Sequence, residues 1–159
     1  MSSGFEEARS TVMWSAAKSA GAALIPIAIF RIPALTGITS SMGEDIMESY
    51  GYESLRGPAN FLAVAIGACA GISLANEILN KFPGIGTFAA SASTASLHII
   101  TGSFLIIVCE MMQAGEITDE ELQDTAICKA LCKKWLKKVG SIALKIATGK
   151  SPVELAYAA

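Results

Sequence analysis

Charged side chains are scarce in this chain of 159 residues, and histidine is almost absent. Asp, Glu, Lys and Arg together make up 16% of the residues, and His98 is the one histidine. Soluble proteins contain about 25% charged residues. Hydrophobic residues make up 52% of the chain and its mean hydropathy is +0.50. This composition indicates contact with a membrane or a large interface with other proteins, and the length fits one domain, 1–159.

The sequence also lacks the residue groups that metal sites and hydrolytic sites need. Glu44 and Glu48 are spaced like carboxylates of a metal-binding bundle, but such bundles add Glu-x-x-His motifs that one histidine cannot supply. The four cysteines form no Cys-x-x-Cys pair, which fits reduced thiols; they are Cys69, Cys109, Cys128 and Cys132. We therefore expect no metal, no cofactor, no enzymatic activity and no binding to nucleic acid.

Two further features have a functional and a structural interpretation. The stretch TGKSP at 148–152 ends like a phosphate-binding loop, but such a loop needs glycine where Leu144 stands. We interpret it as a helix C-cap. His98 lies between apolar residues, so it is either a site for a proton or partner, or a buried histidine held by hydrogen bonds. The second interpretation is the favoured one.

Helical periodicity runs through the chain, and no alternating strand pattern of any length occurs, which predicts an all-α bundle of about five helices. Pro26 is expected to end or kink the first helix, and Pro33 to open the second, which ends at Gly51. Apolar residues of the second helix recur at three and four positions and predict its buried face: Leu35, Ile38, Met42, Ile46 and Tyr50.

A long helical hairpin is predicted at the centre, with helices over about 60–79 and 86–112. The first carries a stripe of small residues that favours close helix packing: Ala63, Gly67, Gly71 and Ala75. The turn between the helices contains Pro83, Gly84 and Gly86. Each helix is long enough to cross a hydrocarbon core of about 30 Å.

Gly115 is expected to follow the second hairpin helix, and a capping box of Thr118 and Glu121 opens a basic amphipathic helix predicted over 118–147. Residues 129–159 carry seven lysines and one glutamate, a net charge of +6, against −8 for residues 1–128. The predicted contact surface for a membrane or partner consists of Lys129, Lys133, Lys134, Trp135, Lys137 and Lys138. An apolar stripe with lysines on both edges fits a helix on an anionic leaflet, and equally one docked on the acidic body.

The N-terminus has Glu6 and Glu7 where a signal peptide would have positive charge, so no cleaved signal peptide is expected. The lysine-rich C-terminal region favours the cytoplasmic side of a membrane.

Two stretches resemble a known family. Residues 25–51, IPIAIFRIPALTGITSSMGEDIMESYG, place Met42 eight residues before a Tyr-Gly pair, and residues 81–104, KFPGIGTFAASASTASLHIITGSF, combine a PGIG turn with Thr94 and Gly102. The segment 15–112 is similar to the helical domain of unknown function 697, the YcjF-like family. The family's usual glutamine three residues before the methionine is Thr39 here. The resemblance implies an all-α, membrane-associated module that works with a GTPase, here supplied by another chain, and implies no catalytic residues.

The sequence is consistent with two alternative functions. The first is a non-enzymatic, membrane-associated helical protein whose partners are lipid, a protein such as a GTPase, or further copies of itself in a homo-oligomer. The alternative is a soluble helical adaptor or structural subunit of a larger complex, in which neighbouring proteins cover the apolar surface.

Overall fold

The described part of the chain is all-α. The computed structural model describes residues 3–23, 28–53 and 86–124, together with residues 126, 127, 130, 131, 134, 145, 146, 148 and 149. Three long helices and one short helix are present in these segments: α1 (Ser3–Ala22), α2 (Ala28–Ser49), α4 (Gly86–Gln113) and α5 (Asp119–Gln123). The all-α prediction is confirmed for this part, and α4 matches the predicted 86–112 closely.

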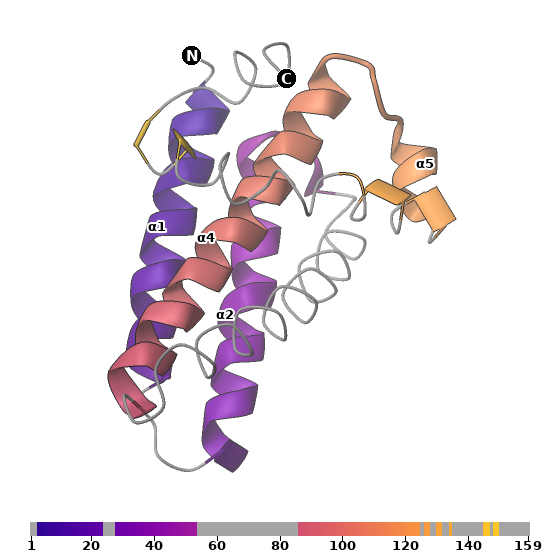
Figure 1. Cartoon of the computed structure of the whole chain (residues 1–159). Coiled ribbons are helices and arrows are strands. Elements are labelled where there is room, and N and C mark those ends of the chain that lie inside the picture. The colour runs from indigo at the N-terminus through magenta and orange to yellow at the C-terminus, as the bar shows by residue number, and fades with distance from the viewer. Residues whose placement is uncertain are drawn as a thin grey trace.

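The three long helices pack side by side (Figure 1), with α1 antiparallel to both α2 and α4. The N-terminus of α1 therefore lies beside the C-terminus of α2. At this point Gly4 permits a close approach, because a Cβ atom on Gly4 would lie 2.6 Å from the carbonyl oxygen of Ser49. The bundle thus has two ends, one formed by the start of α1 and the ends of α2 and α4, the other by the opposite termini.

Each outer helix buries one stripe of residues. On α1 the buried positions recur at three and four residues, as expected for one helix face: Phe5, Ala8, Val12, Ser15, Ala16, Ser19 and Ala23. On α2, Met42, Ile46 and Tyr50 are buried, with Leu35 and Ile38 partly buried, so the predicted face is confirmed. Met47 joins this face and is fully buried.

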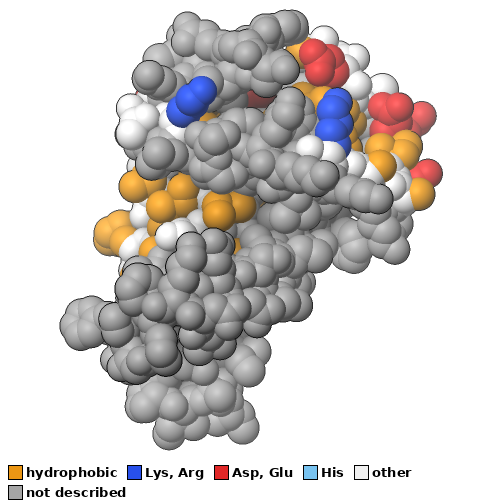
Figure 2. Space-filling view, in the orientation of Figure 1, with side chains coloured by type: hydrophobic (Ala, Val, Ile, Leu, Met, Phe, Trp, Pro, Cys, Tyr) orange, Lys and Arg blue, Asp and Glu red, His pale blue; other side chains and the backbone are white. Residues whose placement is uncertain are grey.

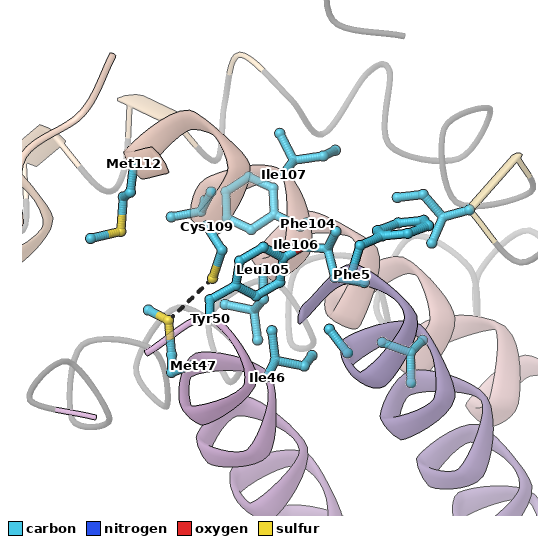
Figure 3. Packing of buried hydrophobic residues seen from close by; sticks show 14 of the residues in the cluster. Phe5, Ile46, Met47, Tyr50, Phe104, Leu105, Ile106, Ile107, Cys109 and Met112 are labelled. Atoms are coloured by element: carbon cyan, nitrogen blue, oxygen red, sulfur yellow. Dashed lines mark hydrogen bonds between the residues drawn. The ribbon is translucent and has the colours of Figure 1, made fainter. Parts of the chain in front are cut away.

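The centre of the bundle is the second half of α4, where every residue from Thr101 to Cys109 is buried. Figure 3 shows its side chains packed between Phe5 of α1 and Ile46, Met47 and Tyr50 of α2. Within the described residues, the segment Thr94–Gln113 is long and apolar enough to cross a membrane. However, 67% of that window is buried inside the bundle, as in the core helix of a soluble protein.

Two predicted helix ends are confirmed, each by a glycine with positive φ. Gly51 (φ 80°) follows α2 and Gly115 (φ 73°) follows α4. At both, the residue after glycine donates its N–H to a carbonyl five positions back, from Tyr52 to Met47 and from Glu116 to Met111. These are Schellman caps, in which a left-handed glycine lets the chain satisfy the last helical carbonyls. The capping box of Thr118 and Glu121 is also present at the start of α5.

Two predicted boundaries are wrong. The second helix begins at Ala28 and contains Pro33, rather than beginning at Pro33. Pro33 has no backbone N–H, so α2 lacks the helical bond from residue 33 to the carbonyl of Ile29.

The predicted continuous helix over 118–147 is interrupted, because α5 ends at Gln123 and Asp124 is extended (φ −82°, ψ 114°). The Asp124 carboxylate accepts the N–H of Ala126 at 2.7 Å, and helical backbone resumes at residues 126 and 127. Aspartate competes with the helix in this way because its short side chain offers the backbone amides an alternative acceptor.

The predicted first helix of the hairpin, about 60–79, lies outside the described residues. The C-terminal segment is described at a few positions only. There, Ile146 is buried in the core and Leu131 packs against it. At these two positions the apolar stripe contacts the body of the protein.

Candidate functional site

The three long helices meet closely at Gly102 of α4. A Cβ atom on Gly102 would overlap Cγ2 of Val12 on α1, and would lie 3.2 Å from Sδ of Met42 on α2. Glycine disfavours a helix by about 1 kcal/mol relative to alanine, so its presence here is explained by the approach of two neighbouring helices. Val12 and Met42 therefore both meet Gly102 at one point of the bundle.

One helical turn before Gly102 on α4, His98 links α4 to α2. The ring is buried, with 3% of its surface exposed. Its Nδ1 lies 3.0 Å from the carbonyl oxygen of Thr94, and its Nε2 lies 3.0 Å from the hydroxyl of Thr39. Burial lowers the pKa of His98, and the bond to the Thr94 carbonyl opposes this effect. The prediction of a buried, hydrogen-bonded histidine is confirmed.

The hydrogen bonds of His98 determine where its proton sits. A carbonyl only accepts, so Nδ1 carries the proton and donates it to Thr94. In the neutral ring Nε2 then accepts from the Thr39 hydroxyl. The same hydroxyl lies 2.8 Å from the carbonyl oxygen of Leu35, to which it donates when Nε2 is itself protonated. Both ring states keep α2 and α4 connected, which identifies a structural role for this group.

Two other polar side chains of α4 are buried without a hydrogen-bond partner. Thr101 and Ser103 are 1% and 0% exposed, and neither hydroxyl contacts a donor or acceptor. An unsatisfied buried hydroxyl typically costs about 1–3 kcal/mol. These hydroxyls therefore weaken an otherwise apolar layer of the bundle.

A pair of contacts closes the opposite end of the α2–α4 interface. The hydroxyl of Tyr50 donates to the Glu110 carboxylate at 2.6 Å, and Cys109 Sγ lies 3.4 Å from Met47 Sδ (Figure 3). Burial and the bond to Glu110 raise the pKa of Tyr50. Burial, with a smaller effect of Glu110, raises the pKa of Cys109 to about 12. Cys109 is a free, buried thiol that packs like a small apolar side chain, as predicted.

The stretch around Gly149 is a helix C-cap, as predicted. Gly149 has φ 85° and donates its N–H to Ile146 at 2.9 Å. Arg9 of α1 donates through Nε to the same carbonyl at 3.0 Å. This hydrogen bond connects Ile146 of the C-terminal segment to Arg9 in the first half of α1.

Within the described residues 3–23, 28–53 and 86–124, acidic residues are confined to one end of the bundle. Segments 3–9, 44–53 and 110–124, which we name the acidic end, contain twelve acidic residues and one basic residue, Arg9. Segments 10–23, 28–43 and 86–109, which we name the acid-free end, contain no Asp or Glu and two basic residues, Lys18 and Arg31. The antiparallel packing brings these segments together (Figure 1), and in Figure 2 the visible Asp and Glu side chains all lie in the upper part of the molecule.

The acid-free end carries an exposed aromatic residue on α1. Trp14 is 64% exposed and its neighbour Met13 is 40% exposed; these are the exposed large hydrophobic side chains among the described residues. The ammonium of Lys18, one turn further along, lies 5.5 Å from the centre of the Trp14 ring. Such a cation–π contact contributes about 0.5–1 kcal/mol when exposed.

Most sequence-predicted site residues lie outside the described part of the chain. The small-residue stripe from Ala63 to Ala75, the turn residues Pro83 and Gly84, and Lys129, Lys133, Trp135, Lys137 and Lys138 are all in this group. Gly86 is the first residue of α4, and Lys134 is exposed. Sequence reasoning missed Trp14 and Lys18, although the aromatic–lysine spacing of four residues is visible in the sequence.

Comparisons with known proteins found no match: no family model, no curated protein and no solved structure is similar to this chain. Within the described residues, no group of His, Cys, Asp and Glu side chains is arranged to hold a metal ion.

Proposed function

We propose that this chain is a non-enzymatic helical protein that associates with one leaflet of a membrane through its acid-free end. The observation that supports this proposal is the separation of charge along the bundle. A leaflet containing anionic lipids repels carboxylates and attracts lysine and arginine, so it favours the end whose described segments contain Lys18 and Arg31 and no acidic residue. The acidic end then faces water.

The burial of α4 supports attachment to one leaflet over a membrane-crossing helix. Residues Thr101 to Cys109 are all buried within the structure, so this half of α4 has no surface to offer to lipid. The residues just before this segment are less enclosed, since Thr94, Leu97, Ile99 and Ile100 are partly exposed. Lipid contact is therefore proposed for residues 94–100 of α4 and for the α1 and α2 residues beside them.

The same proposal includes the packing of the predicted helix 60–79 and a protein partner. Helix 60–79 is proposed to pack on α4 through its small-residue stripe, as the sequence predicts. The resemblance to the YcjF-like family adds a GTPase in trans as the protein partner, on the cytoplasmic side. The acidic end is the surface that stays accessible to such a partner when the acid-free end is in lipid.

A soluble adaptor is the second candidate, and the burial of 67% of the most apolar window inside the bundle favours it. In that case the acid-free end is covered by a neighbouring protein. The predicted helical fold is the same in both cases, so only the partner of the acid-free end distinguishes them.

Vesicle flotation of the purified chain, together with alkaline carbonate extraction from cell membranes, tests the proposal. The protein is expected to float with vesicles that contain phosphatidylglycerol, and less with phosphatidylcholine alone. Two matched variants change the charge at Gly37, an exposed position of the acid-free end. Gly37→Arg adds a cation and is expected to increase flotation, whereas Gly37→Glu adds a carboxylate and is expected to reduce it. A monodisperse protein that binds neither vesicle, and is released from membranes by carbonate, contradicts the proposal and supports the adaptor.

A further inference from the structure

We propose that Trp14 and Lys18 form a headgroup anchor that binds the phosphate of an anionic phospholipid and determines how deeply the bundle enters the leaflet. This inference rests on the proposed membrane function and identifies the residues and the lipid chemistry of the contact. It depends on three observations: the exposure of the pair, the direction of the Lys18 side chain, and the length of α1 beyond Trp14.

The anchor is exposed because it lies opposite the buried face of α1. Val12, Ser15 and Ser19 point into the bundle, whereas Trp14, Ala17, Lys18 and Gly21 are exposed. The small residues Ala17 and Gly21 leave the indole ring as the largest feature of this face. An exposed tryptophan is unfavourable in water, but its amphipathic ring suits the boundary between headgroups and acyl chains.

The Lys18 side chain extends toward the acidic end. Its ammonium lies against the ring of Trp14, which is one turn nearer the N-terminus of α1. The charge is therefore displaced away from the acid-free end, in the direction that would be toward water on a membrane. Lysine side chains at membrane boundaries adopt this arrangement, with the aliphatic stem along the apolar surface and the ammonium at the headgroups.

The two side chains offer complementary groups to a phosphate. The Lys18 ammonium provides positive charge and three N–H donors, and the Trp14 indole provides one N–H donor. Neither group accepts a hydrogen bond in these states, so the pair matches an anion that has several acceptor oxygens. A lipid phosphate is favoured over free phosphate because the same residues present an apolar ring.

The length of α1 beyond Trp14 determines how deeply the helix enters the leaflet. Eight residues follow Trp14 before the helix ends at Ala22, which corresponds to about 12 Å at 1.5 Å per residue. Half of a hydrocarbon core is about 15 Å thick. With Trp14 at the headgroup boundary, α1 therefore ends inside the first leaflet.

The experiment measures vesicle binding of the full chain and of W14A and K18Q. With phosphatidylglycerol vesicles, W14A is expected to weaken partitioning about tenfold, because about half of the transfer free energy of a large side chain is lost. K18Q is expected to weaken it about fivefold, as for one cation near an anionic surface. With phosphatidylcholine alone, K18Q is expected to bind like the parent. The control E7Q, at the exposed acidic end of α1, is expected to change binding less than about twofold because screening shortens its reach.

Tryptophan fluorescence provides the second measurement. In a W135F background Trp14 is the one remaining tryptophan, so its emission is expected to shift to the blue on vesicles. Lipids brominated near the headgroup are expected to quench it more than lipids brominated at the chain end. Because Trp14 and Lys18 are exposed, W14A and K18Q should keep the helical circular dichroism spectrum of the parent.

The possible failures are distinct. If the parent binds neither vesicle, the proposed membrane function is wrong. If the parent binds while W14A and K18Q bind equally well, the membrane function stands and the anchor is wrong. If W14A leaves vesicle binding unchanged but abolishes a dimer in light scattering, this face binds a second copy of the chain and the lipid inference is overturned.

Discussion

Adding one methyl group at Gly102 tests the packing of the bundle where its three long helices meet. In Gly102→Ala the new Cβ overlaps Cγ2 of Val12, and it lies 3.0 Å from the other methyl of Val12 and 3.2 Å from Sδ of Met42. Overpacking of this kind costs about 1–3 kcal/mol. Replacing glycine by alanine within a helix returns about 1 kcal/mol. The expected net loss is therefore up to about 2 kcal/mol of unfolding free energy.

Gly37→Ala is the matched control. Gly37 lies inside α2, is exposed, and has no atom within 4 Å of the position where its Cβ would be. The helix propensity gain is the same, so Gly37→Ala is expected to stabilise the protein by about 0.4–1 kcal/mol. The difference between the two variants, about 1–3 kcal/mol, isolates the overlap at Gly102.

The assay is urea unfolding followed by far-ultraviolet circular dichroism, with the midpoint and slope compared among variants. In the double variant Val12→Ala with Gly102→Ala, the new methyl occupies space that Val12 vacates. The two changes should therefore be coupled by at least about 1 kcal/mol, the double variant being more stable than the sum predicts. Equal stabilisation by Gly102→Ala and Gly37→Ala would refute the proposed close contact.

Three further predictions concern the buried groups of α4. Thr101→Val removes an unsatisfied hydroxyl at constant shape and is expected to increase the free energy of unfolding by about 1 kcal/mol, which raises the urea midpoint; a lower midpoint would mean that the hydroxyl has a partner. The pKa of His98 is lowered in the folded protein, so its neutral form is favoured and stability falls as pH drops below the unfolded value of about 6.5. Between pH about 7.5 and about 5.5 the parent should therefore lose more stability in urea titrations than His98→Gln, and equal losses would contradict this. Cys109, with its pKa raised to about 12, should resist iodoacetamide at pH about 8 and react in urea, as scored by peptide mass spectrometry; rapid alkylation of the folded protein would show that the thiol is accessible.

Local chemistry explains which features the sequence predicted well. The helix ends at Gly51 and Gly115 and the capping box at Thr118 depend on residues within one or two turns of each other. The buried face of α2 follows from periodicity alone. The prediction over 118–147 was wrong at Asp124 for a related reason, since the apolar stripe continues past this residue while its carboxylate ends the helix locally.

The sequence by itself determined that the described segments are helical, where most of those helices end, and which faces are apolar, because these properties depend on neighbours along the chain. Tertiary structure alone decided that His98 bonds to Thr39, fifty-nine residues away, and that Gly102 contacts both Val12 and Met42. It also decided where the acidic residues lie in space. Those in the described part of the chain are spread over 3–9, 44–53 and 110–124 in the sequence, and they gather at one end because α1 runs antiparallel to α2 and α4. Residues far apart in the chain acquire a common surface only through packing, so Trp14 and Lys18 gained their significance from the folded bundle.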